Sequence, residues 1–453
     1  MSKNHSMRNQ IWASLRLALP LILANLSSGL MNIVDNSIAG HHSVVTLAAV
    51  SFSAAVFWIP MLFCMGCLVA STVLIAQSHG AQEVGAIAPI FHQALWLALL
   101  MGAAMFGFLT LVIAYLPLLP LPPPEQVAAA DFMGIMRWAA PGLTIFFCMR
   151  YLSEGVHWTL PTMLLGFGGL LILAPLGYAL TQGRWGFRPH GAQGIAIAST
   201  TMVWAQVLCF AGYLRISRRW VPYALFSHWH RPDIHKMLHI LRTGLPIGLS
   251  LFMEGGIFLV FSLLMLRFGR VSVDAHQIAL SVAQICFMIP VGVAEATTIR
   301  VGHAIGSKDL PAVRQAALAG CLIVIISQIL IGGMLVLCRD LAVAMYTNDV
   351  QVIALASDLL LLVSAFQIPD GIQVVCAGAL RGMRDTRIPM LLAMVSYWCI
   401  GFPLALCCGF YLHWGPEGMW FGLVIGLTVA SILLASRLYM RSGSFKRPPA
   451  AGI

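Results

Sequence analysis

Long apolar stretches, interrupted by short polar or basic segments, run through the whole chain. Each stretch is close to the roughly 20 residues that a helix needs to cross the hydrocarbon core of a bilayer. The pattern therefore predicts about twelve membrane-spanning helices joined by short connections. Their expected ranges are 17–39, 47–75, 88–117, 133–156, 161–183, 194–214, 241–266, 274–304, 312–337, 351–378, 387–411 and 417–438.

Composition supports the same fold class. Of the 453 residues, 59% are hydrophobic and 9% are charged, which is typical of an all-α, polytopic membrane protein and not of a soluble domain. The first apolar stretch follows a short basic leader, as the core of a cleaved signal peptide would. We reject cleavage because an internal repeat, described below, uses Pro20 inside this stretch as the structural partner of Pro246.

The net charge of +10 is unevenly distributed. If the twelve helices alternate in direction, most of the 26 Lys and Arg residues fall on the side that holds both termini. This is the positive-inside bias, so both termini and the basic linker at 215–242 are expected to be cytoplasmic. Such a linker indicates topology and contact with anionic lipid, and we expect no nucleic-acid partner. The six basic residues expected on the opposite side are Arg137, Arg184, Arg188, Arg267, Arg270 and Arg339.

An internal repeat relates the two halves of the chain. Six Pro and Gly residues recur in order in the second half, at separations of 224 to 228 positions. The repeat predicts two six-helix lobes, 1–222 and 223–453, with the same orientation because each holds an even number of crossings. Parallel repeats place a substrate site at their interface near the bilayer midplane. The matched pairs are Pro20 and Pro246, Gly80 and Gly306, Pro161 and Pro389, Pro175 and Pro403, Gly191 and Gly415, and Gly194 and Gly418.

Glu254 lies near the middle of the apolar stretch 246–266. A carboxylate at this depth costs roughly 2.5 to 3.5 kcal/mol on insertion scales, so we expect it to face a wet cavity or a partner. Ser250 lies one turn earlier, and the glycines that follow Glu254 allow local distortion that exposes carbonyl oxygens. Glu254 is therefore predicted to bind a cation in transit.

Asp370 is the predicted partner of Glu254. Gln367 and Gln373 lie three residues to either side of it, on the same helical face. Pro369 removes a backbone donor, so a kink and a free carbonyl oxygen are expected. Two carboxylates with amide and carbonyl oxygens form a site for a hard cation such as Na⁺. Because two adjacent charges of the same sign repel, the pair is expected to take up a proton, a metal ion or a cationic ligand.

A third acid, Asp35, ends a polar stripe in the first helix. Asn25, Ser28, Asn32 and Asp35 are spaced by three or four residues and share one helical face. This face is a candidate lining for a cavity in the first half, although Asp35 is also compatible with simple solvation at the membrane interface. Glu154 follows Arg150 by one turn, and we interpret these two as an ion pair at a helix end.

Several segments together resemble the multidrug and toxic compound extrusion family, in particular its bacterial NorM-type transporters. They are IVDNSIAG around Asp35, LFMEGG around Glu254, VDAHQIALS at 273–281, SKDLPAVRQAA after Gly306 and PDGIQVVCAGALRGMRDTRIPM at 369–390. The resemblance implies two six-helix lobes and export of cationic organic compounds in exchange for Na⁺ or H⁺. It also implies that Glu254 and Asp370 form a cation site in the second lobe and that Asp35 takes part in coupling in the first.

The chain departs from the family pattern at three positions. Leu173 and Gly177 stand where such transporters carry Asn on each side of a proline, so the hydrogen-bond network around Asp35 is expected to be thinner. Phe366 stands where a Tyr hydroxyl is expected, four residues before Asp370. These departures leave the coupling ion, Na⁺ or H⁺, open.

Other functions fit the sequence less well. A flippase or exporter of a lipid-linked or polysaccharide precursor shares the two-lobe architecture, but it needs a cationic cavity, and the residues at midplane are acidic. A membrane oxidoreductase needs paired His residues, and a passive channel accumulates nothing against a gradient. We expect no enzymatic activity and no cofactor beyond the transported ion. We also expect a monomer in the bacterial inner membrane, with lipid and organic cations as its partners.

Overall fold

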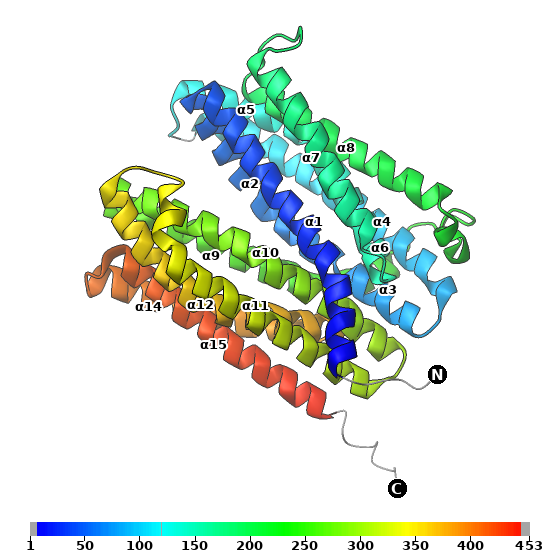
Figure 1. Ribbon diagram of the computed structural model, residues 1–453. Coiled ribbons are helices and arrows are strands. Elements are labelled where there is room, and N and C mark those ends of the chain that lie inside the picture. The colour runs from blue at the N-terminus through cyan, green and yellow to red at the C-terminus, as the bar shows by residue number, and fades with distance from the viewer. Residues whose placement is uncertain (1–6, 119, 445–453) are drawn as a thin grey trace. The chain divides into compact units, whose positions relative to one another are not determined.

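The computed structural model describes residues 7–118 and 120–444, and within these ranges all regular secondary structure is helical (Figure 1). The helices of the first half are α1 (Met7–His42), α2 (Val44–Leu68), α3 (Ala70–Gly80), α4 (Val84–Tyr115), α5 (Pro123–Met136), α6 (Ala139–Gly155), α7 (Leu160–Gln182) and α8 (Ala192–Ile216). Those of the second half are α9 (Ile234–Met265), α10 (Arg270–Gly306), α11 (Leu310–Ala344), α12 (Val350–Gly382), α13 (Arg387–Met394), α14 (Phe402–Leu406) and α15 (Gly415–Ser444).

Five short segments complete the described structure. Three are 3₁₀ turns: η1 (Leu116–Leu118), η2 (Arg218–Tyr223) and η3 (Leu266–Phe268). Two are π-helical: η4 (Val395–Gly401) and η5 (Cys407–Tyr411). The π-helical segments interrupt a single membrane-spanning stretch, which continues from α13 through α14.

The described residues contain 11 helices long and apolar enough to span a membrane, or 12 if α5 and α6 count as one bent span. The predicted fold class and the prediction of about twelve helices are confirmed. The fourth crossing begins ten residues before its expected range, 133–156, and consists of α5 and α6, which are bent by 45° relative to each other. Arg137 lies at this bend, where it donates to Thr110 Oγ1 at 3.2 Å and lies 5.1 Å from the ring centre of Phe106.

The chain packs into two compact units. Within the described residues, the C-terminal unit contains 7–22 together with 249–444, and the N-terminal unit contains 23–118 and 120–248. In α1 and in α9 alike, the boundary falls two residues after the proline of the repeat, Pro20 or Pro246. The lobes 1–222 and 223–453, which rest on sequence symmetry, stay a prediction.

Two pairs of glycines matched by the repeat have the same backbone conformation or the same close packing in both units. Gly191 and Gly415 have positive φ angles of 52° and 63°, a backbone conformation that glycine adopts without strain. A Cβ atom on Gly194 would lie 2.7 Å from the backbone carbon of Leu180, and one on Gly418 would lie 2.6 Å from that of Cys408. Because no larger residue fits these two contacts, helix packing explains why Gly194 and Gly418 recur in the repeat.

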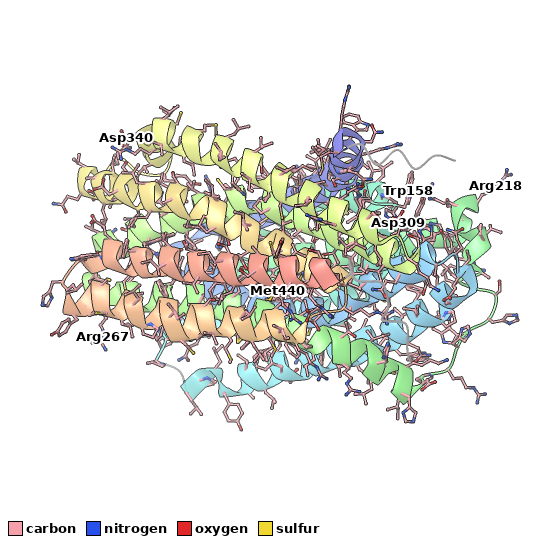
Figure 2. All side chains as sticks on the ribbon, turned by 90° about the horizontal axis from the view of Figure 1, so that it is seen from below. Trp158, Arg218, Arg267, Asp309, Asp340 and Met440 are labelled. Carbon is pink, nitrogen blue, oxygen red and sulfur yellow. The ribbon has the colours of Figure 1, made fainter. Side chains whose placement is uncertain are left out.

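In the C-terminal unit, α12 is the central helix and contacts α10, α11 and α15 (Figure 1). Thr298 Oγ1 donates to the carbonyl of Gly378 at 2.8 Å, which fixes α10 against α12. Figure 2 shows Arg267 and Asp340 at one end of this unit and Asp309 at the other. These positions agree with helices that alternate in direction along the chain.

Candidate cation and substrate site

The structure brings Glu254 and Asp370 together at the amide of Gln373. Gln373 Nε2 donates to Glu254 Oε1 at 3.4 Å and to Asp370 Oδ1 at 3.3 Å. Glu254 comes from α9, whereas Asp370 and Gln373 come from α12 and lie three residues apart on one helical face. A single nitrogen atom that contacts both carboxylates shows that the two acids converge, as the sequence predicted. Their role as cation ligands stays a prediction.

The acid pair is largely removed from solvent. Asp370 is 5% exposed, Glu254 is half-buried, and Gln373 is buried. Gln367 is also buried, and within the described chain its Nε2 has no hydrogen-bond partner. Ser250 lies half-buried one turn before Glu254 on α9.

Arg381 acts electrostatically on Glu254. It lies in the last turn of α12, 11 residues after Asp370, or about 16 Å along the helix axis. A long Arg side chain carries its charge well away from its own Cα, so Arg381 can act on Glu254 from the end of α12. α12 itself runs without interruption through Pro369.

Asp35 faces a cavity inside the N-terminal unit. The cavity has a volume of about 80 Å³. Ser199 Oγ donates to Asp35 Oδ2 at 3.4 Å, and Asp35 Oδ1 is buried without a hydrogen-bond partner in the described ranges. The cavity is too small for a drug-sized ligand, which needs roughly 300 Å³ or more, but it has room for a few water molecules or a small ion. Its polar lining consists of Ser28, Asn32, Asp35, Arg150, Thr162, Ser199 and Gln206.

The four polar residues predicted to share a face of α1 make two kinds of contact. Ser28 and Asn32 line the cavity with Asp35, and Asn32 Nδ2 donates to the carbonyl of Ser28 at 3.5 Å. Asn25 instead accepts a hydrogen bond from Arg150 Nη2 at 3.1 Å. Three of the four residues on the predicted face therefore belong to one site.

Arg150 and Glu154 form the predicted ion pair, with Nε and Oε1 2.5 Å apart. They do not lie in solvent at a helix end, because Arg150 is 4% and Glu154 is 1% exposed. Arg150 also lines the Asp35 cavity. A buried ion pair is stable only if further hydrogen bonds satisfy both groups, which Asn25 does in part. The sequence showed the pair but not its burial.

Of the two departures from the family pattern near Asp35, Leu173 lies at the cavity and Gly177 packs against α1. Leu173 lines the cavity and is fully buried. A Cβ atom on Gly177 would lie 3.1 Å from Cδ1 of Ile38, which is three residues after Asp35. This wall of the cavity is therefore apolar, and Ser199 supplies the hydrogen bond to Asp35.

Sequence reasoning missed a second polar group in the C-terminal unit. Trp420 Nε1 donates to His276 Nδ1 at 3.2 Å, so the other ring nitrogen, Nε2, carries the proton and donates to Ser262 Oγ at 3.0 Å. Ser262 then donates to the carbonyl of Phe258 at 3.0 Å. Trp420 stacks on Phe366, one turn before Asp370. The single signal in the sequence was an isolated His in an apolar helix.

Known proteins match the chain in family and fold. The MatE family model matches residues 20–179 and again residues 246–407, beginning at the first two matched prolines of the repeat. The probable multidrug resistance protein NorM of Xanthomonas campestris pv. campestris is 54% identical over 94% of this chain and 93% of its own length. Multidrug resistance protein PmpM of Pseudomonas aeruginosa is 35% identical over 99% of this chain and 95% of its own.

A solved structure shows the same fold at low sequence identity. A mutant of the Vibrio cholerae MATE transporter VcmN superimposes with a TM-score of 0.88 at 16% identity, and the match covers 97% of this chain and 98% of that one. The family model matches both halves of the chain, and a relative at 54% identity covers nearly its whole length. The chain therefore belongs to the multidrug and toxic compound extrusion family of multi-pass membrane transporters.

Proposed function

We propose that this protein is a secondary active multidrug exporter that moves cationic lipophilic compounds out of the cell in exchange for inward Na⁺ or H⁺. The names of the relatives support multidrug resistance as the biological role. The observation that carries the proposal is the Gln373 amide between two carboxylates. Its NH₂ group occupies the position where a cation would neutralise both acids, so the site is arranged for positive charge.

Coupling follows from competition at this site. In the outward-facing state, an external Na⁺ or H⁺ neutralises Glu254 and Asp370 and weakens their hold on a bound organic cation, which leaves. In the inward-facing state, the ion dissociates and a new organic cation replaces it. Entry of one monovalent cation gains about 2.3 kcal/mol per 100 mV of membrane potential, which is enough to sustain a substantial substrate gradient.

The proposed setting is the bacterial inner membrane, with both termini in the cytoplasm and the protein acting as a monomer. The uneven distribution of Lys and Arg supports this orientation. Export of a lipid-linked precursor is less compatible with the site, because phosphate would meet two carboxylates that already repel each other.

Ethidium efflux from proteoliposomes tests the proposal, with Na⁺ and pH gradients imposed separately. Glu254→Gln and Asp370→Asn should each reduce ion-driven efflux to the level of protein-free vesicles, because a neutral side chain cannot bind the two cations in alternation. Asp358→Asn and Glu417→Gln are matched controls, since both acids are exposed and Asp358 lies on the same helix as Asp370. Undiminished efflux by either site variant at normal reconstitution would refute the assignment.

A further inference from the structure

Tyr397 is a buried polar residue near the acid pair that the competition mechanism leaves unused. It is 5% exposed, and in the part of the chain that the structure describes its hydroxyl has no hydrogen-bond partner. Leaving a hydroxyl buried and unpaired costs about 1 to 3 kcal/mol. A ligand that binds at this position would remove the penalty.

Tyr397 shares one buried apolar cluster with residues of both helices that carry the acids. The cluster includes Ile257 of α9 and Phe366 of α12. Ile257 lies one turn after Glu254, and Phe366 lies one turn before Asp370, so each shares a helical face with its acid. Both carboxylates also act electrostatically on the Tyr397 side chain.

Trp398, the residue after Tyr397, contacts α9 near Glu254. Trp398 Cζ2 lies 3.8 Å from the position that a Cβ atom would take on Gly256, two residues after Glu254. Trp398 of η4 therefore lies close to α9 beside Glu254. The phenol and the indole are therefore positioned by one short segment.

That segment is π-helical. η4 covers Val395–Gly401, and Pro403 follows shortly after it. Pro403 has no N–H to bond the carbonyl of Cys399, so the α-helical hydrogen-bond pattern cannot continue there. A π-helical turn holds an extra residue and rotates the side chains that follow, and such turns occur frequently at functional sites.

We propose that the Tyr397 hydroxyl is a third oxygen ligand for a Na⁺ ion bound by Glu254 and Asp370. This inference rests on the proposed function. A hard cation needs several oxygen ligands, and a neutral hydroxyl adds lone pairs without adding charge. A proton, by contrast, is bound by one carboxylate oxygen and needs no third group. Tyr397 should therefore matter for Na⁺ and much less for H⁺.

The test is Tyr397→Phe, which removes the oxygen and keeps the ring. The purified protein is reacted with a hydrophobic carbodiimide, and protection of the Glu254 and Asp370 peptides by NaCl is measured by mass spectrometry at fixed pH, with choline chloride as the balancing salt. Loss of one ligand should raise the NaCl concentration for half-protection about fivefold or more. Ethidium efflux driven by a pH gradient should change less than twofold.

Tyr411→Phe is the matched control, because Tyr411 is 79% exposed and lies at the end of the same membrane-spanning stretch. The control should protect like the unmodified protein. If Tyr397→Phe does not fold, Tyr397→Leu is measured in the same way. Because the hydroxyl is unpaired, removing it should not lower the thermal unfolding temperature.

Three results overturn the inference: unchanged half-protection in Tyr397→Phe, an equal loss of Na⁺-driven and pH-driven efflux, and an unmodified protein that NaCl does not protect. None of these touches the proposed function, which fails only if Glu254→Gln or Asp370→Asn leaves efflux intact. The protection assay and the efflux assay therefore separate the two claims.

Discussion

The two units have matching repeat residues, but their buried charged side chains are paired differently. In the C-terminal unit, two carboxylates meet at the amide of Gln373. In the N-terminal unit, Arg150 and Glu154 neutralise each other, and Asp35 faces a cavity with room for a few water molecules or a small ion. One unit brings two carboxylates together, whereas the other combines a permanent internal ion pair with a single acid.

Positions related by the repeat show how far this divergence goes. At the separation set by Pro20 and Pro246, Glu254 of α9 corresponds to Ser28 of α1. Asp35 of α1 corresponds to Phe261 of α9, which is buried in the apolar core. The matched Pro and Gly residues keep the helix packing the same. The acidic residues do not follow the repeat, so the repeat predicts the helix arrangement but not the positions of the buried acids.

The largest expected effect is on the stability of the N-terminal unit. Arg150→Ala should destabilise the fold by about 3 to 5 kcal/mol, because it removes the buried cation that pairs with Glu154. Thermal unfolding in detergent measures the loss. Glu254→Gln, which removes a charge from a repulsive pair, should leave the unfolding temperature unchanged or raise it.

The double variant Arg150→Met with Glu154→Leu is the control for charge removal, and it should recover most of the loss. An Arg150→Ala protein as stable as the unmodified one would show that the ion pair is not structural. The contrast between the two units would then disappear.

A smaller effect is expected at Gln373. Gln373→Met removes the NH₂ group that stabilises the empty acid pair, so the coupling cation should bind more tightly and dissociate more slowly. Hydrogen bonds to charged groups contribute about 1.5 to 3 kcal/mol, so the ion concentration for half-maximal efflux should fall about tenfold and turnover should fall with it. Ion titrations of ethidium efflux check this.

Gln277→Met on α10 is the control, because Gln277 is exposed. A rise in the half-maximal ion concentration in Gln373→Met would contradict the idea that the amide occupies the place of the cation. It would make Gln373 a ligand of the cation instead.

The smallest effect is expected at the apolar wall of the Asp35 cavity. Leu173→Asn places an amide donor near the unpaired Oδ1 of Asp35 and should shift the half-maximal ion concentration about two- to fivefold, the size of one modest hydrogen bond. The shift should vanish in an Asp35→Asn background. An equal shift in both backgrounds would mean that the amide acts through packing alone.

Much of the fold and part of the site were predictable from local sequence. The lengths of the apolar stretches predicted the membrane crossings, and the matched Pro and Gly residues predicted the repeat. Both signals lie in the sequence itself and do not depend on which helices are in contact. The convergence of Glu254 and Asp370 was predictable because each acid lies deep within an apolar stretch, where it needs a partner. The Arg150–Glu154 pair was visible in the sequence as a one-turn spacing.

Other parts depended on contacts between helices distant in sequence. Nothing near Tyr397 in the sequence indicates that its hydroxyl is buried close to two acids. The burial of Arg150 and Glu154, and the influence of Arg381 on Glu254, likewise depend on which helices surround them.

The sequence by itself determined that this protein crosses a membrane about twelve times in two related halves, because a bilayer selects for apolar length and for satisfied backbone groups within each helix. Only the tertiary structure decided which polar side chains share a site and which remain unpaired. The reason is physical: a side chain's hydrogen-bond partners and its burial are set by neighbouring helices, and these come from any part of the chain.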